Sequence, residues 1–240
     1  MLEPQPQDPA HFELDAHGLP VGLTVEGWEP RPAPERITLT GRYVRVEPLS
    51  SAHYAELFST LCTEDDDERW TYLGKRPSSL PELWMLLAAR LESDPATYAI
   101  VPLEGDAAGT PCGLFTLYAI NQADGSVELG SVLFGRHLQR SRAATEAVHL
   151  MLTYCLDTLG YRRFEWKLNS LNERSHRAAR RFGFTYEGRF RNARVQQGRN
   201  RDTDWYSIIA EEWPEIRARQ QRWLDPANFD ADGRQRSVLR

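Results

Sequence analysis

Cysteine is scarce in this sequence, and its three cysteines form no recognisable pattern. Cys62, Cys112 and Cys155 lack the Cys-x-x-Cys spacing of zinc sites and redox motifs, and an odd number cannot complete a set of disulfides. The histidines show no metal-ligand spacing either. We therefore expect reduced thiols in a reducing compartment, no disulfide framework and no metal site.

Long apolar runs are also missing. No stretch approaches the roughly 18 consecutive apolar residues that a membrane-spanning helix needs. The Pro-rich and acidic N-terminus is unlike a signal peptide. We find no internal repeats and no second domain among the 240 residues. These absences predict a cytoplasmic protein without a membrane partner.

A strong positive charge is absent overall but present locally. The net charge of −5 argues against a general nucleic-acid binder, so a nucleic-acid partner is not expected. Residues 136–201, however, hold fourteen Arg and one Lys against five acids, a balance of +10, whereas residues 64–68 read EDDDE. This asymmetry predicts an anionic ligand. A small phosphate-bearing molecule would satisfy it, and RNA or the ribosome is the other class that fits.

The N-terminal residues 1–36 form an extension. They contain seven prolines, which prevents most of the segment from being helical. A packed or mobile arm is the simpler interpretation, and a functional lid is the alternative.

A long amphipathic helix is predicted over residues 144–159, and it begins directly after a turn rich in arginine. Gly160 supplies its stop. The first N–H groups of a helix have no partner within it and attract an anion, best a phosphate. Arg136, Arg140 and Arg142 would reinforce such a site, although Arg140 and Arg142 could instead only solvate an exposed turn. The apolar positions recur at helical spacing: Ala144, Ala147, Val148, Met151, Leu152, Cys155 and Leu159.

A second strand and helix follow. Residues 161–168 read as a strand, and either Ser170 with Glu173 as a capping box or Asn172 alone would start the next helix. Ser175 shares one face of that helix with three apolar residues and so points inward, and Gly183 ends the helix. The apolar residues on this face are Ala178, Ala179 and Phe182.

These motifs resemble the GNAT superfamily of acyl-CoA N-acyltransferases, in particular its RimJ/RimL-like branch. The family's pyrophosphate turn, Gln/Arg-x-x-Gly-x-Gly/Ala, is similar to Gln139, Arg142 and Ala144, with Thr145-Glu146-Ala147 as a frequent continuation. The resemblance is specific over residues 126–210, plausible from residue 37 and absent before it. A later family signature is matched by Asn172, Ser175, Ala178, Gly183, Phe184, Glu187 and Gly188.

The resemblance implies an α+β (α/β) fold. In it, a central mixed, mostly antiparallel sheet flanked by helices splays open, and acetyl-CoA enters the gap. The backbone of three strand residues would contact the pantetheine arm, the turn would bind the pyrophosphate, and Asn172 would contact the pantetheine or cap its helix. The implied cofactor-binding residues are Val132, Leu133, Phe134, Gln139, Arg140, Ser141, Arg142, Ala143, Ala144, Thr145 and Asn172.

One residue departs from the family's turn. Arg142 stands where the family has its middle Gly, which normally lets the backbone approach the phosphates closely. Arg142 could keep its N–H available and add a charge, or it could weaken cofactor binding. The first interpretation follows from the resemblance.

Two residues are candidates for catalysis. Glu128, in the third strand of a meander, could deprotonate the acceptor amine; the alternative is a solvated or salt-bridged strand residue. Many members of the family use a Tyr as the acid, but the matching position here is Ala179. Ser175 matches the Ser of RimL-like members, which would meet the thiolate leaving group, and a capping role is its alternative.

The acceptor side carries no motif. The resemblance implies that the region after the first strand shapes the acceptor pocket, so Trp70 and Tyr72 are candidate substrate-binding residues. Their alternative is a place among the core aromatics.

The remaining periodicity completes the expected domain. We expect an acetyltransferase domain over residues 37–212 and a C-terminal helix with a loose polar tail over residues 213–240. The first domain would begin with a strand or hairpin at residues 37–48 around Gly41, followed by helices at 49–61 and 81–92. The later strands are expected at 97–102, 113–120, 126–134, 186–196 and 204–209, and the terminal helix at 213–224.

The sequence therefore predicts an N-acetyltransferase. It would transfer the acetyl group of acetyl-CoA, by direct attack in a ternary complex, to a primary amine of a small molecule or a protein N-terminus. A degenerate acyl-CoA-binding sensor or partner module is one alternative, and an RNA- or ribosome-associated protein that uses the Arg-rich half is another. Either a monomer or a homodimer is compatible with the sequence.

Overall fold

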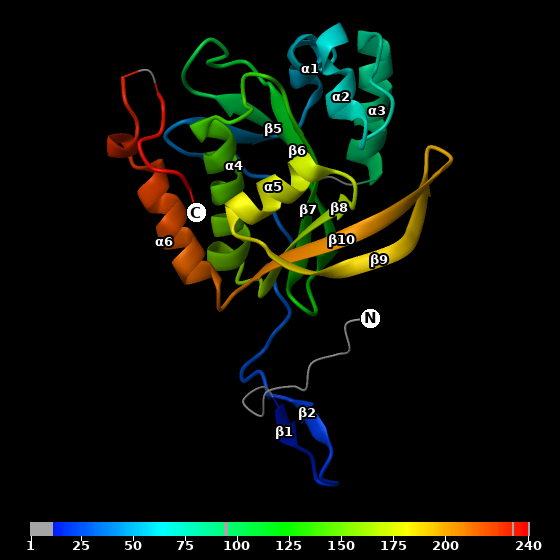
Figure 1. Cartoon of the computed structure of the whole chain (residues 1–240), viewed down its shortest axis with the longest axis vertical. Helices are drawn as coiled ribbons and strands as arrows, with labels where there is room; N and C mark the ends of the chain where they lie inside the picture. The colour runs from blue at the N-terminus through cyan, green and yellow to red at the C-terminus, as the bar shows by residue number, and fades with distance from the viewer. Residues whose placement is uncertain (1–11, 94–95, 232, 240) are drawn as a thin grey trace. The chain divides into compact units, whose positions relative to one another are not determined.

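The computed structural model describes residues 12–93, 96–231 and 233–239, and it divides into two units, Met1–Pro30 and Arg31–Arg240 (Figure 1). In the first unit, β1 (Phe12–Leu14) pairs antiparallel with β2 (Pro20–Gly22). Residues 1–11 of the predicted extension lie outside the described residues. Residues 31–36 of the predicted extension belong to the larger unit, where Tyr154 Oη accepts the N–H of Glu35 at 2.8 Å.

The larger unit is built on an eight-stranded sheet with the order β3-β4-β5-β6-β7-β8-β10-β9. All neighbouring pairs are antiparallel except β7 and β8, which are parallel. The mixed, mostly antiparallel sheet expected from the sequence is confirmed. Its strands are β3 (Leu39–Thr40), β4 (Val44–Pro48), β5 (Thr97–Pro102), β6 (Gly113–Asn121), β7 (Ser126–Phe134), β8 (Arg163–Asn169), β9 (Thr185–Gln196) and β10 (Arg199–Ile209).

The sheet opens between β7 and β8. These strands pair only at their beginnings, from Ser126↔Arg163 to Glu128↔Glu165. Beyond Glu128, β7 continues to pair with β6, up to Phe134↔Gly113, while β8 continues to pair with β10. Residues 129–134 therefore present a backbone edge toward β8 that none of the described strands occupies, and this is the splay expected from the sequence.

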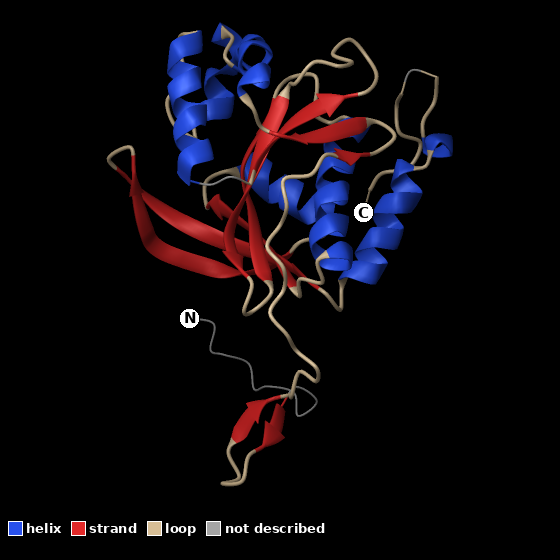
Figure 2. Cartoon of the chain, turned by 180° about the vertical axis from the view of Figure 1, so that it is seen from behind, coloured by secondary structure: helices blue, strands red, loops and turns tan. Residues whose placement is uncertain are grey.

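Two groups of helices cover the sheet (Figure 2). The first group is α1 (Tyr54–Leu61), α2 (Asp67–Trp70) and α3 (Leu80–Ser93), and α1 and α3 share a core with Ala99 and Leu114. The second group is α4 (Arg142–Thr153), α5 (Glu173–Phe182) and α6 (Trp213–Leu224), which build the larger core with the other face of the sheet.

Helix α4 begins two residues earlier than the sequence suggested, because Ser141 is its N-cap. Its last turn, Tyr154–Thr158, winds as a π-helix before Gly160 takes a left-handed φ of 71°. All seven expected apolar positions contribute to the larger core, and Cys155 is fully buried there.

A buried carboxylate fastens α4 to the β3–β4 hairpin. Glu146 is 7% exposed and accepts the backbone N–H groups of Arg42, Tyr43 and Val44 at 3.0, 2.6 and 3.1 Å. A Cβ added to Gly41 would lie 2.4 Å from this carboxylate. The glycine at the hairpin turn is therefore required by a close approach rather than by its φ angle.

The C-terminal helix has the predicted bounds, but the tail after it is not loose where the structure describes it. Phe229 packs against the rings of Trp223 and Tyr43 at 5.1 and 6.0 Å between ring centroids. Phe229 and Leu239 are both 7% exposed. The tail is polar in composition, and two of its apolar residues, Phe229 and Leu239, anchor it.

Smaller differences concern the first helices and the last strand. A 3₁₀ turn, Ser51–His53, precedes α1, and α3 starts at Leu80, so Pro81 is its second residue. Strand β10 begins at Arg199 rather than 204. Within the described ranges, no helix combines the length and the hydropathy needed to cross a bilayer.

Candidate functional site

The turn before α4 leaves several backbone donors free. Ser141 Oγ accepts the N–H of Ala144 at 3.0 Å, and Arg140 adopts a left-handed φ of 60°. Among the described residues, no acceptor contacts the N–H groups of Arg140, Arg142 and Ala143. Unpaired N–H groups at a helix start favour an anion, so the geometry fits the pyrophosphate turn that the family resemblance implies.

The side chain of Arg142 points away from the place where a phosphate would bind the turn. Its guanidinium forms a two-pronged ion pair with Glu104, with Nη2–Oε2 at 2.7 Å. It also lies over the rings of Tyr43 and Phe229, at 4.4 and 4.8 Å from their centroids. The hydrogen bonds that Arg142 donates to Glu104 raise the pKa of Arg142. Because Glu104 neutralises this charge, only the backbone N–H of Arg142 remains a candidate for binding an anion.

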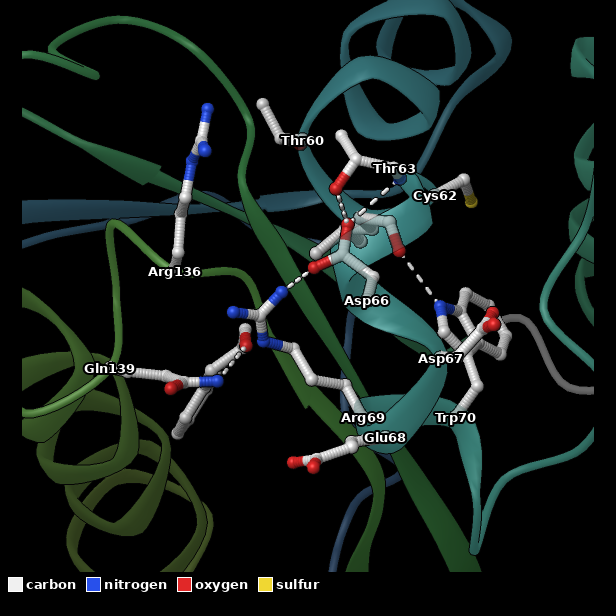
Figure 3. Close-up of polar contacts among 12 residues, drawn as sticks. Thr60, Cys62, Thr63, Asp66, Asp67, Glu68, Arg69, Trp70, Arg136 and Gln139 are labelled. Carbon is white, nitrogen blue, oxygen red and sulfur yellow. Dashed lines mark hydrogen bonds and ion pairs between the residues drawn. The ribbon is translucent and has the colours of Figure 1, made fainter.

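Three other arginines gather at the same place from three elements. Figure 3 shows the Arg69 side chain extending from α2 toward Gln139, with Arg136 close by. Burial lowers the pKa of Arg69, and the positive charges of Arg174 and Arg136 lower it further, so the three groups lie within electrostatic reach of one another. Arg69 is paired with Asp66 and Arg174 with Glu68. The sequence analysis singled out Arg136 alone, because Arg69 and Arg174 reach this place only through the fold.

The strand residues expected to contact the pantetheine line the open edge of β7. Leu133 is buried, whereas Val132 and Phe134 are half-buried. The Phe134 carbonyl accepts a hydrogen bond from Gln139 Nε2 at 3.3 Å (Figure 3). Thr145, the last residue of the expected turn, is buried and accepts a hydrogen bond from Arg181.

Across the gap, Asn172 and Ser175 lie at the start of α5. Asn172 is the N-cap, and its Oδ1 accepts the N–H of Ser175 at 3.1 Å. Ser175 is therefore not the cap; its Oγ accepts the indole N–H of Trp166 at 2.9 Å. The hydroxyl hydrogen of Ser175 stays free to be donated, because Oγ serves as the acceptor in that bond.

Glu128 lies at the point where the sheet opens, and it is salt-bridged. Lys167 Nζ contacts Glu128 Oε2 at 3.0 Å and Glu165 Oε2 at 2.7 Å. The same ammonium lies 3.9 Å from the centroid of the Trp205 ring. Glu128 is thus a salt-bridged strand residue, as the alternative interpretation expected, and the salt bridge holds its carboxylate in position.

Strand β10 adds polar groups that the sequence analysis missed. Arg201 Nε, Thr203 Oγ1 and Trp205 Nε1 are buried and have no hydrogen-bond partner in the described part of the chain. They occupy alternate positions of one strand, and Trp205 pairs in register with Lys167, so they belong to the same sheet face as Glu128. Their alternation was visible in the sequence, but only the pairing register shows which face it lies on.

Trp70 and Tyr72 have different surroundings. Trp70 is 3% exposed and donates its indole N–H to the Leu61 carbonyl at 2.8 Å, which favours the core interpretation (Figure 3). Tyr72 is half-buried, and its hydroxyl donates to the Leu171 carbonyl at 3.0 Å, next to the start of α5. Of the two, Tyr72 alone lies beside the gap.

The cysteines are free and buried. Burial raises the pKa of Cys62 to about 11 and of Cys112 to about 12, and it raises that of Cys155 as well. The part of the chain that the structure describes contains no group of three or more His, Cys, Asp or Glu residues arranged to hold a metal ion.

Comparison with known proteins relates this geometry to one family. Residues 44–185 match the family model "Acetyltransferase (GNAT) domain". Among curated proteins, "Putative ribosomal N-acetyltransferase YdaF" of Bacillus subtilis is 27% identical over 105 residues, which cover 44% of this chain and 57% of that protein. The match thus spans less than two thirds of that relative.

Solved structures agree over most of the chain. A GCN5-related N-acetyltransferase from Brucella melitensis is 42% identical, with a TM-score of 0.86, covering 90% of this chain and 97% of its own. A "probable acetyltransferases (GNAT family)" structure from Chromobacterium violaceum is 35% identical, with a TM-score of 0.73, covering 82% and 98%. These matches confirm the resemblance that the motifs indicated.

Proposed function

The chain belongs to the GNAT family of acetyltransferases, and on that premise we propose that it transfers the acetyl group of acetyl-CoA to a primary amine. The transfer is a direct attack in a ternary complex, without a covalent enzyme intermediate. The acceptor is a small molecule or a protein N-terminus, and the reaction takes place in the cytoplasm.

The observation that carries the proposal is the meeting of two features at one place. The sheet opens beyond Glu128 on β7, and the free N–H groups of Arg140, Arg142 and Ala143 lie just past the end of the same strand. A thioester arm along the open edge of β7 and phosphates on the turn fit one continuous ligand. Acetyl-CoA has this composition: a pantetheine chain that ends in a thioester and a pyrophosphate at its other end.

The chemistry assigns roles to two residues. The amine nitrogen attacks the thioester carbonyl carbon and gives up a proton, and Glu128, held in place by Lys167, takes it directly or through water. The C–S bond of the tetrahedral intermediate then breaks, and the leaving sulfur receives a proton from the Ser175 hydroxyl, which Trp166 orients and which regains a proton from water. Backbone donors along the open edge of β7 supply hydrogen bonds to the developing oxyanion.

The acceptor side is formed by the polar face of β10 and by Tyr72. The unpartnered groups of Arg201, Thr203 and Trp205 donate hydrogen bonds to oxygen atoms of the substrate that receives the acetyl group. The name of the Bacillus subtilis relative mentions the ribosome, which favours a protein N-terminus as one acceptor class to test.

The test is acetyl-CoA binding by calorimetry, followed by thiol release with a panel of amines. Arg136→Glu places a negative charge at the turn and is expected to weaken binding by about tenfold or more. Arg191→Glu makes the same charge change at an exposed position of β9 and serves as the control. Wild-type protein that binds no acyl-CoA would overturn the proposal.

A second candidate function is a protein that binds acyl-CoA but does not catalyse acetyl transfer. Lys167 holds the Glu128 carboxylate, and the Tyr that many family members use is replaced by Ala179; these two observations favour an acyl-CoA-binding sensor as the second candidate. Micromolar acetyl-CoA binding with no thiol release for any amine, N-terminal peptides included, would favour the sensor.

A further inference from the structure

A second basic site lies outside the gap, between α6 and the C-terminal tail. A cavity of about 300 Å³ opens there, lined by residues that include Arg219, Arg222, Trp223, Asn228, Ser237 and Leu239. In Figure 1 the tail leaves the end of α6 and returns to lie between α6 and α4. No acidic residue is among those that line the cavity.

Among the described residues, the arginines at and beside this cavity have no counter-charge. In the ranges that the structure describes, no carboxylate forms an ion pair with Arg181, Arg219 or Arg222. Arg219 Nε is buried and has no hydrogen-bond partner. Burial lowers the pKa of Arg181, and no neighbouring acid opposes that effect. A buried guanidinium nitrogen without a partner is unfavourable, so Arg219 favours a bound anion here.

Arg181 connects this cavity with α4. Its Nη1 donates to Thr145 Oγ1, in the first turns of α4, at 2.8 Å. Its guanidinium lies over the Trp223 ring at 4.7 Å from the centroid. Arg219 borders the same place, because a Cβ on Gly183, just after α5, would lie 2.6 Å from its Nη2. Arg181 thus connects the first turns of α4 with Trp223, which lines the cavity together with Arg219 and Arg222.

The polar groups of the cavity are donors rather than acceptors. Asn228 is committed to the chain, since its Nδ2 donates to the Trp223 carbonyl and its Oδ1 accepts the N–H of Ser237. Arginines remain to bind the ligand, and the planar guanidinium suits the paired oxygens of a phosphate. A phosphate monoester matches this site better than a monovalent carboxylate, because it carries up to two negative charges.

We propose that the cavity lined by Arg219 and Arg222, beside the stacked Arg181 and Trp223, binds a phosphate monoester group. That group is either the ribose 3′-phosphate of acetyl-CoA, which one ribose separates from the pyrophosphate, or the phosphate of a separate molecule that binds beside the cofactor. The first source rests on the proposed function, whereas the second does not.

The experiment compares acetyl-CoA with 3′-dephospho-acetyl-CoA by calorimetry, and it measures the thermal midpoint in inorganic phosphate. The variants are Arg219→Gln and Arg222→Gln, with Arg191→Gln as the control for loss of one arginine. Circular dichroism checks folding, and Arg222, which is exposed, provides a variant whose substitution leaves the core intact.

If the cofactor supplies the phosphate, the wild type binds acetyl-CoA about tenfold or more tightly than the dephospho form. The Arg219 and Arg222 variants lose that preference and keep their affinity for the dephospho form. If a separate molecule supplies it, the two cofactors bind alike and phosphate raises the thermal midpoint in the wild type but not in the variants.

Equal binding of both cofactors, together with no phosphate-dependent shift, would overturn this site while leaving the acetyltransferase proposal intact. A phosphate-dependent shift in a protein that binds no acyl-CoA would support this site and overturn the acetyltransferase proposal instead.

Discussion

Arg142 and Glu104 form a two-pronged ion pair that fixes the start of α4 to the loop after β5, with Nη2–Oε2 at 2.7 Å. Arg142 occupies the position where the family's turn has a glycine, and the pair explains how an arginine is accommodated there. The guanidinium leaves the turn and packs over Tyr43 and Phe229, so the backbone N–H is not covered by its own side chain.

Arg142→Gly is therefore expected to lower stability more than cofactor binding. The loss of a partly exposed ion pair and its cation–π contacts should cost about 1–2 kcal/mol, whereas acetyl-CoA affinity should change less than about threefold. Urea unfolding and calorimetry measure the two effects. Glu104→Gln removes the pair from the other side and should reproduce the stability loss. A large loss of affinity in Arg142→Gly alone would show that the arginine itself binds the cofactor.

The three hydrogen bonds to Glu146 predict a strong effect of a small change. Glu146→Gln replaces one acceptor oxygen with an amide group that faces the N–H groups of Tyr43 and Val44. An unpaired buried donor costs about 1–3 kcal/mol, so we expect unfolding at a correspondingly lower urea concentration. Gly41→Ala should also destabilise the protein, because its Cβ would meet the same carboxylate. Glu211→Gln, at an exposed position, is the control and should be neutral.

Glu187 should make stability depend on pH in the acid range. The hydrogen bonds from Arg163 hold its pKa below the ordinary value of 4.5, against the opposing effect of burial. Since the folded pKa is the lower one, the stabilising contribution is fully present above the ordinary value and is lost as the pH falls through the folded value. Glu187→Gln should flatten the decline in unfolding free energy below about pH 5. An unchanged pH profile in this variant would contradict the assignment.

Thiol chemistry offers a test of the core. All three cysteines are buried, and burial raises the pKa of each. Since the thiolate is the reactive form, the native protein should react slowly with a disulfide reagent at mildly alkaline pH. The unfolded protein should react at all three cysteines at once. Rapid labelling of the native chain at Cys155 would indicate that α4 opens readily.

Elements with strong local patterns could be predicted from the sequence. Strands β5 and β7 and helix α6 have the predicted bounds, because alternation, helical periodicity and flanking turns are properties of neighbouring residues. The opening of the sheet after β7 followed from the family resemblance, and the register confirmed it.

The partners of individual side chains could not be predicted in this way. Arg142 meets Glu104 across 38 residues, and Glu146 meets Tyr43 across 103. Lys167 reaches Glu128 because only the fold makes β7 and β8 parallel neighbours. Such contacts decide whether a charge is free or neutralised. The position of the turn could therefore be predicted from its motif, but the direction of the Arg142 side chain could not.

Ser175 and Trp166 provide the sharpest test of the proposed chemistry. Ser175→Ala removes a hydroxyl that we place at the leaving sulfur, and kcat should fall by about 100-fold or more, the usual contribution of a general acid. The KM for acetyl-CoA should stay within about threefold.

The structural contribution of this hydroxyl can be separated from the catalytic one. Ser175→Ala leaves the Trp166 indole N–H unpaired, at a cost of about 1–3 kcal/mol. Trp166→Phe removes that donor but keeps the serine, so it should lose stability and retain most of its turnover. If both variants lose kcat in proportion to their stability, the serine only holds the indole in place. If Ser175→Ala alone loses kcat, the hydroxyl takes part in the release of the thiol.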